Sequence, residues 1–363
     1  ILSPRPLPAC RLTCGNAVPN VPALRSQAAC QTLEYGRSMA TLRDRGWAYF
    51  DAIVAAAPLR DTNPWVRDGT HTAYRPDYET LEHLLGVPVL LKATSQSGVP
   101  ALALDVWVSY EFRRAGFDAD RVWPRANAPR VLPPEIKDFV EKLPKKDRAA
   151  LWSRISRGVG GMGSANLLGK NYVKQVDVVM SSWATGPELM VSTKRMDSSF
   201  GKNAANRVEE SYGDAKNLRL RHPQAALGFF YSLSAVALET ESDTAEWLID
   251  LLIKLGREDD AYDAVALVLP DLKKSQEPVD PEPEDQAGPI DAGAVDTPGT
   301  PAVAGADEAV DIADVTPVSL YSEAVPDELD PGRFFAVMVN RILDNSPINF
   351  HPEARARRRA PLT

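Results

Sequence analysis

The stretch 175-QVDVVMSSWATGPELMVSTKRM-196 contains two apolar segments that are separated by a turn signal. Residues 175–183 are rich in β-branched side chains and residues 188–196 repeat this character, so both segments are predicted to be strands. Gly186 and Pro187 are typical turn residues, which predicts that the two strands pair as a hairpin or a meander. This pair is the expected centre of the fold.

Helical and extended segments are predicted to alternate around this pair. Apolar residues recur at helical spacing in 102–122, where Gly116 marks the end of the helix. The predicted elements are a helix at 102–122, two helices within 133–158, strands at 175–183 and 188–196, a helix at 203–221, a strand at 225–235, a helix at 243–256 and a strand at 262–270. Such an alternation is typical of an α/β fold.

Composition divides the chain into six regions. They are an extension at 1–38 that is disordered or not native, a helical N-terminal region at 39–100, a core at 101–274, a disordered acidic Pro-rich linker at 275–330, a helix at 331–345 that docks on the body and a basic tail at 346–363. The linker carries fifteen Asp or Glu residues and no Lys or Arg, so it cannot bury enough apolar surface to fold. Met39 begins an amphipathic helix and is the expected native start. A signal peptide is the alternative for 1–38, although the charged-then-apolar pattern is missing.

The charge distribution favours a polyanionic partner. The net charge is −8, but without residues 275–330 it is +7, and a basic body suits nucleic acid. The cysteines are confined to Cys10, Cys14 and Cys30, which argues against a disulfide framework or a Cys-ligated zinc site in the folded part and favours a cytoplasmic protein. No run approaches eighteen apolar residues, so no membrane span is expected.

Carboxylate chemistry is the best supported of the chemistries considered. The Gly-rich segment 158–171 fits neither a Walker loop nor a dinucleotide fingerprint and is interpreted as a flexible loop; the four histidines have no metal-binding spacing. Asp177 lies among apolar residues of the first strand, where an unpaired charge is costly, and Lys194 ends the second strand. A carboxylate that holds Mg²⁺ and a lysine that orients water suit phosphodiester hydrolysis. The alternative is a structural ion pair of Asp177 with Lys174 or Lys194.

The segments 176-VDVV-179 and 189-LMVSTK-194 resemble the motif of the PD-(D/E)XK nuclease superfamily, in which an Asp on one strand is followed on the next by acid-x-Lys. The resemblance covers residues 100–270. It implies a restriction endonuclease-like core, with a mixed central sheet flanked by helices, behind the helical N-terminal region. It also implies an endonuclease that cuts double-stranded DNA with Mg²⁺ or Mn²⁺, and a homodimer is the family expectation.

Ser192 departs from the family motif, because it stands where the acid is expected. A subgroup of the family has Ser-x-Lys at this point and takes its acid from the helix that follows. On this analogy, Asp177 and Glu209 are the expected metal ligands, and Glu210 is the second choice for the displaced acid.

Two other acids are candidates to complete the site. Glu111 lies on the first predicted core helix, where the family often has a Glu. Glu188 lies four strand residues before Ser192, which separates the two by about 13 Å. The expected catalytic set is Asp177, Ser192, Lys194, Glu209 and Glu111.

Basic and polar residues surround the second strand and the helix after it, and they are expected to contact DNA phosphates. They are Arg195, Lys202, Asn203, Arg207, Lys216 and Arg219. A basic solvated helix face is the alternative interpretation. The sequence therefore favours a Mg²⁺-dependent, restriction-type endonuclease over two alternatives. These are a non-catalytic DNA-binding or scaffold protein on a degenerate nuclease fold, and an unrelated α/β protein whose acidic linker recruits partners.

Overall fold

The computed structural model describes residues 41–57, 63–155, 165–198, 200–272 and 310–362. The predicted extension at 1–38, the acidic segment 273–309 and the Gly-rich residues 156–164 lie outside the described residues. The predictions made for those segments are therefore left as they stand.

The centre of the fold is a mixed five-stranded sheet with the order β3-β6-β7-β8-β9. β6 (Val178–Ser182) and β7 (Gly186–Met196) pair antiparallel, with Val178 opposite Val191. The predicted strand pair is confirmed, but Gly186 and Pro187 belong to β7 and pair with β6, so the turn comes before them.

The remaining strands extend the sheet on both sides of this pair. β8 (Ala226–Leu233) runs parallel to β7 after α6 (Phe200–Arg219), and β9 (Ala264–Val268) runs parallel to β8 after α8 (Ser242–Leu255). Since parallel neighbours need a crossover, each connection carries a helix. β3 (Val122–Trp123) pairs antiparallel with β6 at the other edge.

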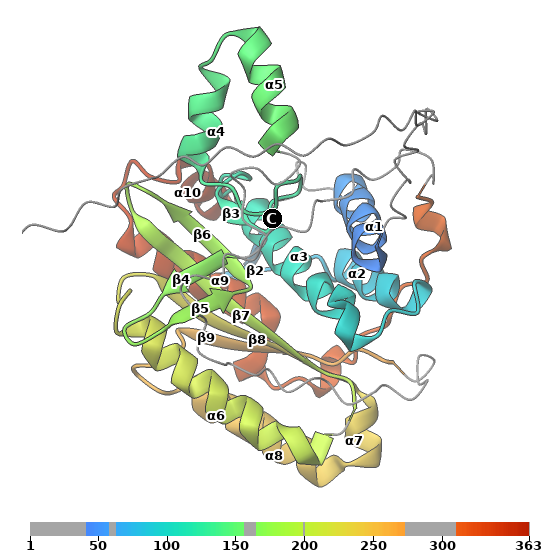
Figure 1. Ribbon diagram of the computed structural model, residues 1–363. Coiled ribbons are helices and arrows are strands. Elements are labelled where there is room, and N and C mark those ends of the chain that lie inside the picture. Colours follow the sequence, from blue (N-terminus) through green and yellow to red (C-terminus); the bar gives the residue numbers. More distant parts are fainter. Residues whose placement is uncertain (1–40, 58–62, 156–164, 199, 273–309, 363) are drawn as a thin grey trace, which may run out of the picture. The chain divides into compact units, whose positions relative to one another are not determined.

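Helices cover both faces of the sheet (Figure 1). α3 (Val99–Arg114) and α9 (Pro331–Asn345) share a hydrophobic core with Val191 and Phe230, whereas α6 and α8 share a second core with Met190 and Phe229. Neighbouring strand residues point to opposite faces, so each strand feeds both cores. The predicted α/β class, with a mixed sheet flanked by helices, is confirmed.

The N-terminal region contains a β-hairpin in addition to the predicted helices. α1 (Leu42–Ala56) begins at a capping box formed by Thr41 and Asp44, and α2 (Tyr78–Leu90) packs beside α3. Between them lies a hairpin of β1 (Trp65–Asp68) and β2 (His71–Tyr74). Tyr74 stacks on Phe335 of α9, so this region shares the α3 core rather than forming a separate domain.

Three further expectations need correction. Part of the predicted flexible loop forms a hairpin of β4 (Ala165–Leu168) with β5 (Val173–Val176). Residues 310–330 of the predicted linker are ordered against the body, because Val315, Val318 and Leu329 are buried. The basic tail contains a helix, α10 (Pro352–Arg359). The other elements are η1 (Ser95–Ser97), α4 (Pro134–Glu141), α5 (Lys145–Ile155), α7 (Val236–Thr240), η3 (Ile312–Asp314), η4 (Ser322–Ala324) and η5 (Asp327–Leu329).

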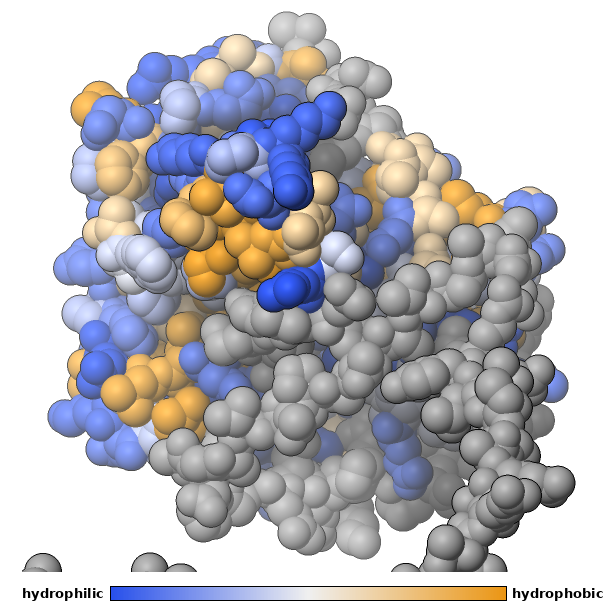
Figure 2. Space-filling view, turned by 45° about the horizontal axis from the view of Figure 1, so that its top comes forward, coloured by the Kyte–Doolittle hydropathy of each residue, from blue (hydrophilic) through white to orange (hydrophobic). Residues whose placement is uncertain are grey.

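The described surface carries scattered apolar side chains. Phe139, Trp183 and Ile348 are the most exposed large apolar residues. Figure 2 shows, on one face, separate apolar patches bordered by hydrophilic residues. Single exposed apolar residues are normal and identify no docking surface. Among the described residues, no helix is both long and apolar enough to cross a membrane.

Candidate active site

Asp177 lies at the bend between β5 and β6, not inside a strand as predicted. Its Oδ2 accepts a hydrogen bond from the backbone N–H of Thr193 on β7, at 2.8 Å. The bend thus turns the carboxylate onto the neighbouring strand, where it satisfies a backbone donor. Asp177 is thereby fixed beside the residue that precedes Lys194.

A second carboxylate reaches the same threonine from the helix α3. Asp105 is 8% exposed, and its Oδ1 accepts a hydrogen bond of 2.5 Å from Thr193 Oγ1. Thr193 presents its hydroxyl to α3 because its side chain lies on the same face of β7 as Val191, which packs in the α3 core. Thr193 therefore holds Asp177 with its backbone and Asp105 with its side chain.

The charges around Asp105 act on one another. Burial is the largest cause that raises the pKa of the Asp105 carboxyl, and the negative charge of Asp177 raises it further. The hydrogen bond from Thr193 and the positive charges of Arg43 and Lys194 oppose this rise. Asp177 and Lys194 are therefore both within electrostatic reach of Asp105. We call Asp105, Asp177 and Thr193 the carboxylate cluster.

Ser192 and Lys194 occupy alternate positions of β7. Their side chains leave the strand on the same face as Met190, which packs in the α6 core. Ser192 is 5% exposed, and its hydroxyl is among the buried polar atoms of the described residues that have no hydrogen-bond partner. Lys194 is paired in register with Tyr231 of β8. The side chain of Lys194 thus starts on the face of β7 opposite the Thr193 hydroxyl, although its positive charge still acts on Asp105. The hydroxyl of Ser192 forms no hydrogen bond with either carboxylate.

Glu111 lies on α3 but in a different group of residues. It is fully buried, and it forms an ion pair with Arg114 at 3.1 Å and accepts hydrogen bonds from Tyr74 Oη (2.9 Å) and the N–H of Asp77 (2.7 Å). Burial raises the pKa of its carboxyl. Glu111 follows Asp105 by six residues, which turns it by roughly 240° around the helix. On the helix that the sequence prediction singled out, the acid that contacts Thr193 is Asp105 and not Glu111.

The acids predicted on α6 also lie elsewhere. Glu209 is exposed, while Glu210 lies 3.9 Å from Lys174 of β5 and 3.8 Å from Arg207. Burial raises the pKa of Tyr262, followed by the negative charges of Asp214, Asp177, Tyr172 and Glu210, in that order. Asp177 and Glu210 therefore both act on Tyr262, and Glu209 is not among the groups that do.

Glu188, the remaining candidate acid, pairs with the C-terminal part of the chain. Glu188 lies near the start of β7, and its Oε2 is 2.7 Å from Nε2 of His351. Burial opposes ionisation of Glu188, but the hydrogen bond and charge of His351 outweigh it and lower the pKa. Glu188 thus joins β7 to the segment before α10 and takes no part in the carboxylate cluster.

The predicted DNA-binding residues do not form one free basic surface. Arg195 pairs with Asp197 at 2.6 Å, and Arg219 pairs with Asp263 at 2.7 Å. Arg207 lies 3.8 Å from Glu210 and Lys216 lies 3.6 Å from Asp260. The side chains of Lys202 and Asn203 lie outside the described residues. Much of this positive charge is neutralised within the protein.

Comparisons with known proteins add no assignment. A scan of family models, a search of curated proteins and a search of solved structures each found no match. Among the described residues, no group of three or more His, Cys, Asp or Glu side chains is arranged to hold a metal ion. The case for a function therefore rests on the carboxylate cluster itself.

The missed residue, Asp105, carries a signal that could have been used. It stands in 102-LALDVWV-108, an acid inside an apolar run, which is the same feature that singled out Asp177. The cost of burying such a charge requires a partner or a function, whether the run is a strand or a helix.

Proposed function

We propose that the protein is a metal-dependent endonuclease that hydrolyses phosphodiester bonds of double-stranded DNA, with Asp105, Asp177 and Lys194 at its centre. One observation carries the proposal: carboxylates from α3 and from the β5–β6 bend both bind Thr193, the residue before Lys194. A carboxyl group with a raised pKa, close to a second carboxylate and acted on by a lysine, is typical of sites built for chemistry.

The order of the elements supports a restriction endonuclease-like reading of the core. A helix (α3) is followed by the antiparallel pair β6 and β7, and then by the crossover helix α6 and the parallel strand β8. The resemblance implied a helix, three strands, a helix and a strand. This order is followed by α3, β3, β6, β7, α6 and β8, with α4, α5, β4 and β5 inserted between β3 and β6. The two carboxylates come from the helix and from the bend that leads into β6.

The carboxylate cluster fits a divalent cation that the protein and its substrate hold together. Mg²⁺ commonly takes one or two protein carboxylates and completes its coordination with water and substrate phosphates. Asp105 and Asp177 would be those ligands, and a cation would offset both the burial and the repulsion from Asp177 that raise the pKa of Asp105. When bound, such a cation polarises a phosphate and lowers the pKa of a bound water.

The remaining residues have distinct tasks in this proposal. The Thr193 backbone and hydroxyl orient the two carboxylates, which makes Thr193 a positioning residue. Lys194 supplies a positive charge that offsets the negative charge developing on the attacked phosphate and orients the water.

Cleavage of duplex DNA tests the proposal. The wild-type chain is expected to cleave long duplex DNA in the presence of Mg²⁺. Addition of a chelator should stop the cleavage. Asp177→Ala and Lys194→Ala should each lose activity while circular dichroism shows an unchanged fold. Full activity in either variant would contradict the assignment.

A non-catalytic DNA-binding or scaffold protein on the same fold is the second candidate. Ser192 in place of an acid and the internal pairing of Arg195 and Arg219 favour it. Calorimetric titration with Mn²⁺, with and without an uncleavable duplex, separates the two. Absence of heat in both titrations would favour the scaffold, and binding that Asp177→Asn removes would favour the enzyme.

A further inference from the structure

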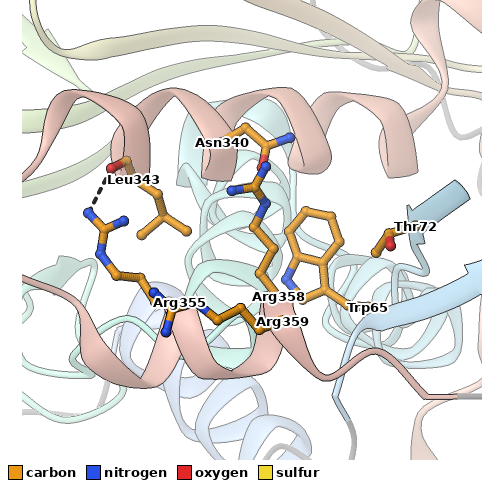
Figure 3. Close-up of a pocket in the computed structure, with 7 residues that line it drawn as sticks. All are labelled: Trp65, Thr72, Asn340, Leu343, Arg355, Arg358 and Arg359. Carbon is orange, nitrogen blue, oxygen red and sulfur yellow. Dashed lines mark hydrogen bonds between the residues drawn. The ribbon is translucent and has the colours of Figure 1, made fainter. Parts of the chain in front are cut away.

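A cavity of about 350 Å³ lies between the β1–β2 hairpin, α9 and α10 (Figure 3). Trp65 and Thr72 line it from the hairpin, Asn340 lines it from α9, and Arg355, Arg358 and Arg359 line it from α10. Three arginines around one small cavity form a local concentration of positive charge. We call this cavity the arginine pocket.

The walls of the arginine pocket are fixed to one another. Leu362, just beyond α10, accepts from Arg67 N–H and donates to Trp65 O, each at 2.8 Å, so the end of the chain pairs with β1. Asn63 Nδ2 donates to the carbonyls of Arg357 and Ala360, both at 2.8 Å. The helix that carries the arginines is therefore held against the hairpin by contacts within the chain.

The three arginines differ in what they bind. Arg355 donates to the carbonyls of Leu343 (2.7 Å) and Ser346 (3.0 Å) and so closes the C-terminal end of α9. Arg358 and Arg359 are exposed, and neither has an ion pair with an acid among the described residues. Figure 3 shows Arg358 extending along the pocket toward Asn340. Arg358 and Arg359 are thus available to an anionic ligand.

Two buried polar atoms at the arginine pocket lack a hydrogen-bond partner in the described part of the chain. They are the indole Nε1–H of Trp65, a residue only 2% exposed, and Oδ1 of Asn340. A buried donor or acceptor without a partner is costly, and such groups in native proteins call for a ligand or a bound water. The pocket therefore offers one unused donor and one unused acceptor beside two available guanidinium groups.

We infer that the arginine pocket binds a small phosphate monoester that also carries hydroxyl groups, such as a sugar phosphate. The phosphate would lie against Arg358 and Arg359, whose planar forks suit its oxygens. A ligand hydroxyl would donate to Asn340 Oδ1, and the indole N–H of Trp65 would donate to a ligand oxygen. The volume lies within the usual range of small-molecule sites. A nucleic acid duplex is disfavoured because it is too wide to reach the buried indole edge.

The arginine pocket is separate from the carboxylate cluster. Arg357 of α10 donates to the carbonyl of Arg114, and Gly116 is so close to Ala354 that a Cβ there would lie 2.8 Å from its backbone nitrogen. α10 therefore lies at the C-terminal end of α3. Asp105 lies nine residues before Arg114, about 13 Å away along the helix axis. The inference does not depend on the proposed nuclease activity.

Isothermal titration calorimetry of the full chain with ribose 5-phosphate, inorganic phosphate and ribose tests the inference. Ribose 5-phosphate should bind more tightly than inorganic phosphate, and ribose should give no heat. Arg358→Ala and Arg359→Ala should each weaken binding about tenfold or more, because each removes a charged hydrogen bond. Both residues are exposed, so the variants should fold. Trp65→Phe, which keeps most of the ring and removes the donor, should also weaken binding.

Arg154→Ala is the matched control, because it removes an exposed arginine from α5. It should leave the affinity unchanged. No binding of ribose 5-phosphate by the wild type, or equal loss in the Arg154 variant, would overturn the inference. Equal affinity for inorganic phosphate would overturn the role given to the ligand hydroxyls. A short DNA duplex could displace ribose 5-phosphate from the wild type and fail to bind the Arg358→Ala variant. That result would show that nucleic acid is the ligand class instead.

Discussion

Asp105 on α3 and Thr193 on β7 are joined by a hydrogen bond of 2.5 Å across 88 residues of sequence. The backbone N–H of the same threonine holds Asp177. Asp105 is buried and Asp177 is half-buried, and the negative charge of Asp177 adds to the cost of ionising Asp105. Such an arrangement reduces the stability of the folded protein, and the proposed metal and phosphate chemistry supplies a reason for it.

Asp105→Asn should stabilise the metal-free protein at neutral pH. The pKa of Asp105 is raised in the folded state, so the folded protein holds this proton more tightly than the unfolded chain does. Stability therefore falls as pH rises from about 4, the ordinary pKa of Asp, through the raised folded pKa. Asn carries no charge and can still accept from Thr193.

Thermal unfolding in a chelator checks this prediction. The Asn variant should have the higher Tm at pH 7, and the difference should shrink toward pH 4. A Tm at pH 7 no higher than that of the wild type would contradict the electrostatic account of the carboxylate cluster.

Ser192→Ala should be tolerated in both stability and cleavage. The Ser192 hydroxyl is buried without a partner among the described residues, so its removal takes away no hydrogen bond. Replacement of an unsatisfied buried polar group by an apolar one is near neutral. Urea unfolding and a cleavage assay measure the two properties side by side. A large loss of cleavage with an unchanged fold would return Ser192 to the catalytic set that the sequence predicted.

Glu111→Ala should destabilise the protein by about 3 kcal/mol or more, because it removes a buried side chain that pairs with Arg114 and accepts a hydrogen bond from Tyr74. The loss should appear as a lower urea midpoint. Glu209→Gln, at an exposed position on α6, is the control and should change the midpoint little. If Glu111→Ala unfolds at the wild-type midpoint but loses cleavage, Glu111 belongs to the active site after all.

The strands and their pairing were predictable from sequence, whereas the choice between the two acids of α3 was not. Apolar residues in 175–196 mark β6 and β7 because strand periodicity is a local signal. α3 is buried on almost every side, from Val99 to Arg114. A helix that is buried all round has no polar face to fix its rotation, so sequence could not tell that Asp105, rather than Glu111, faces β7.

Long-range pairing explains the other errors. Arg219 is neutralised by Asp263, which lies 44 residues further along the chain, so composition overstated the free basic charge. Val315 and Val318 are isolated apolar residues in an acidic segment, yet they bury themselves against the body. In both cases the partner is distant in sequence, and local composition carries no information about it.

The most direct test of the central claim is the single-turnover rate of duplex DNA cleavage in Mg²⁺ by the wild type, Asp105→Asn and Glu209→Gln. The carboxylate cluster predicts cleavage by the wild type, a loss of about a hundredfold or more in Asp105→Asn, since metal ligands contribute several kcal/mol, and an unchanged rate in Glu209→Gln. A wild-type rate in Asp105→Asn, or no metal-dependent cleavage by the wild type on any long duplex, would contradict it.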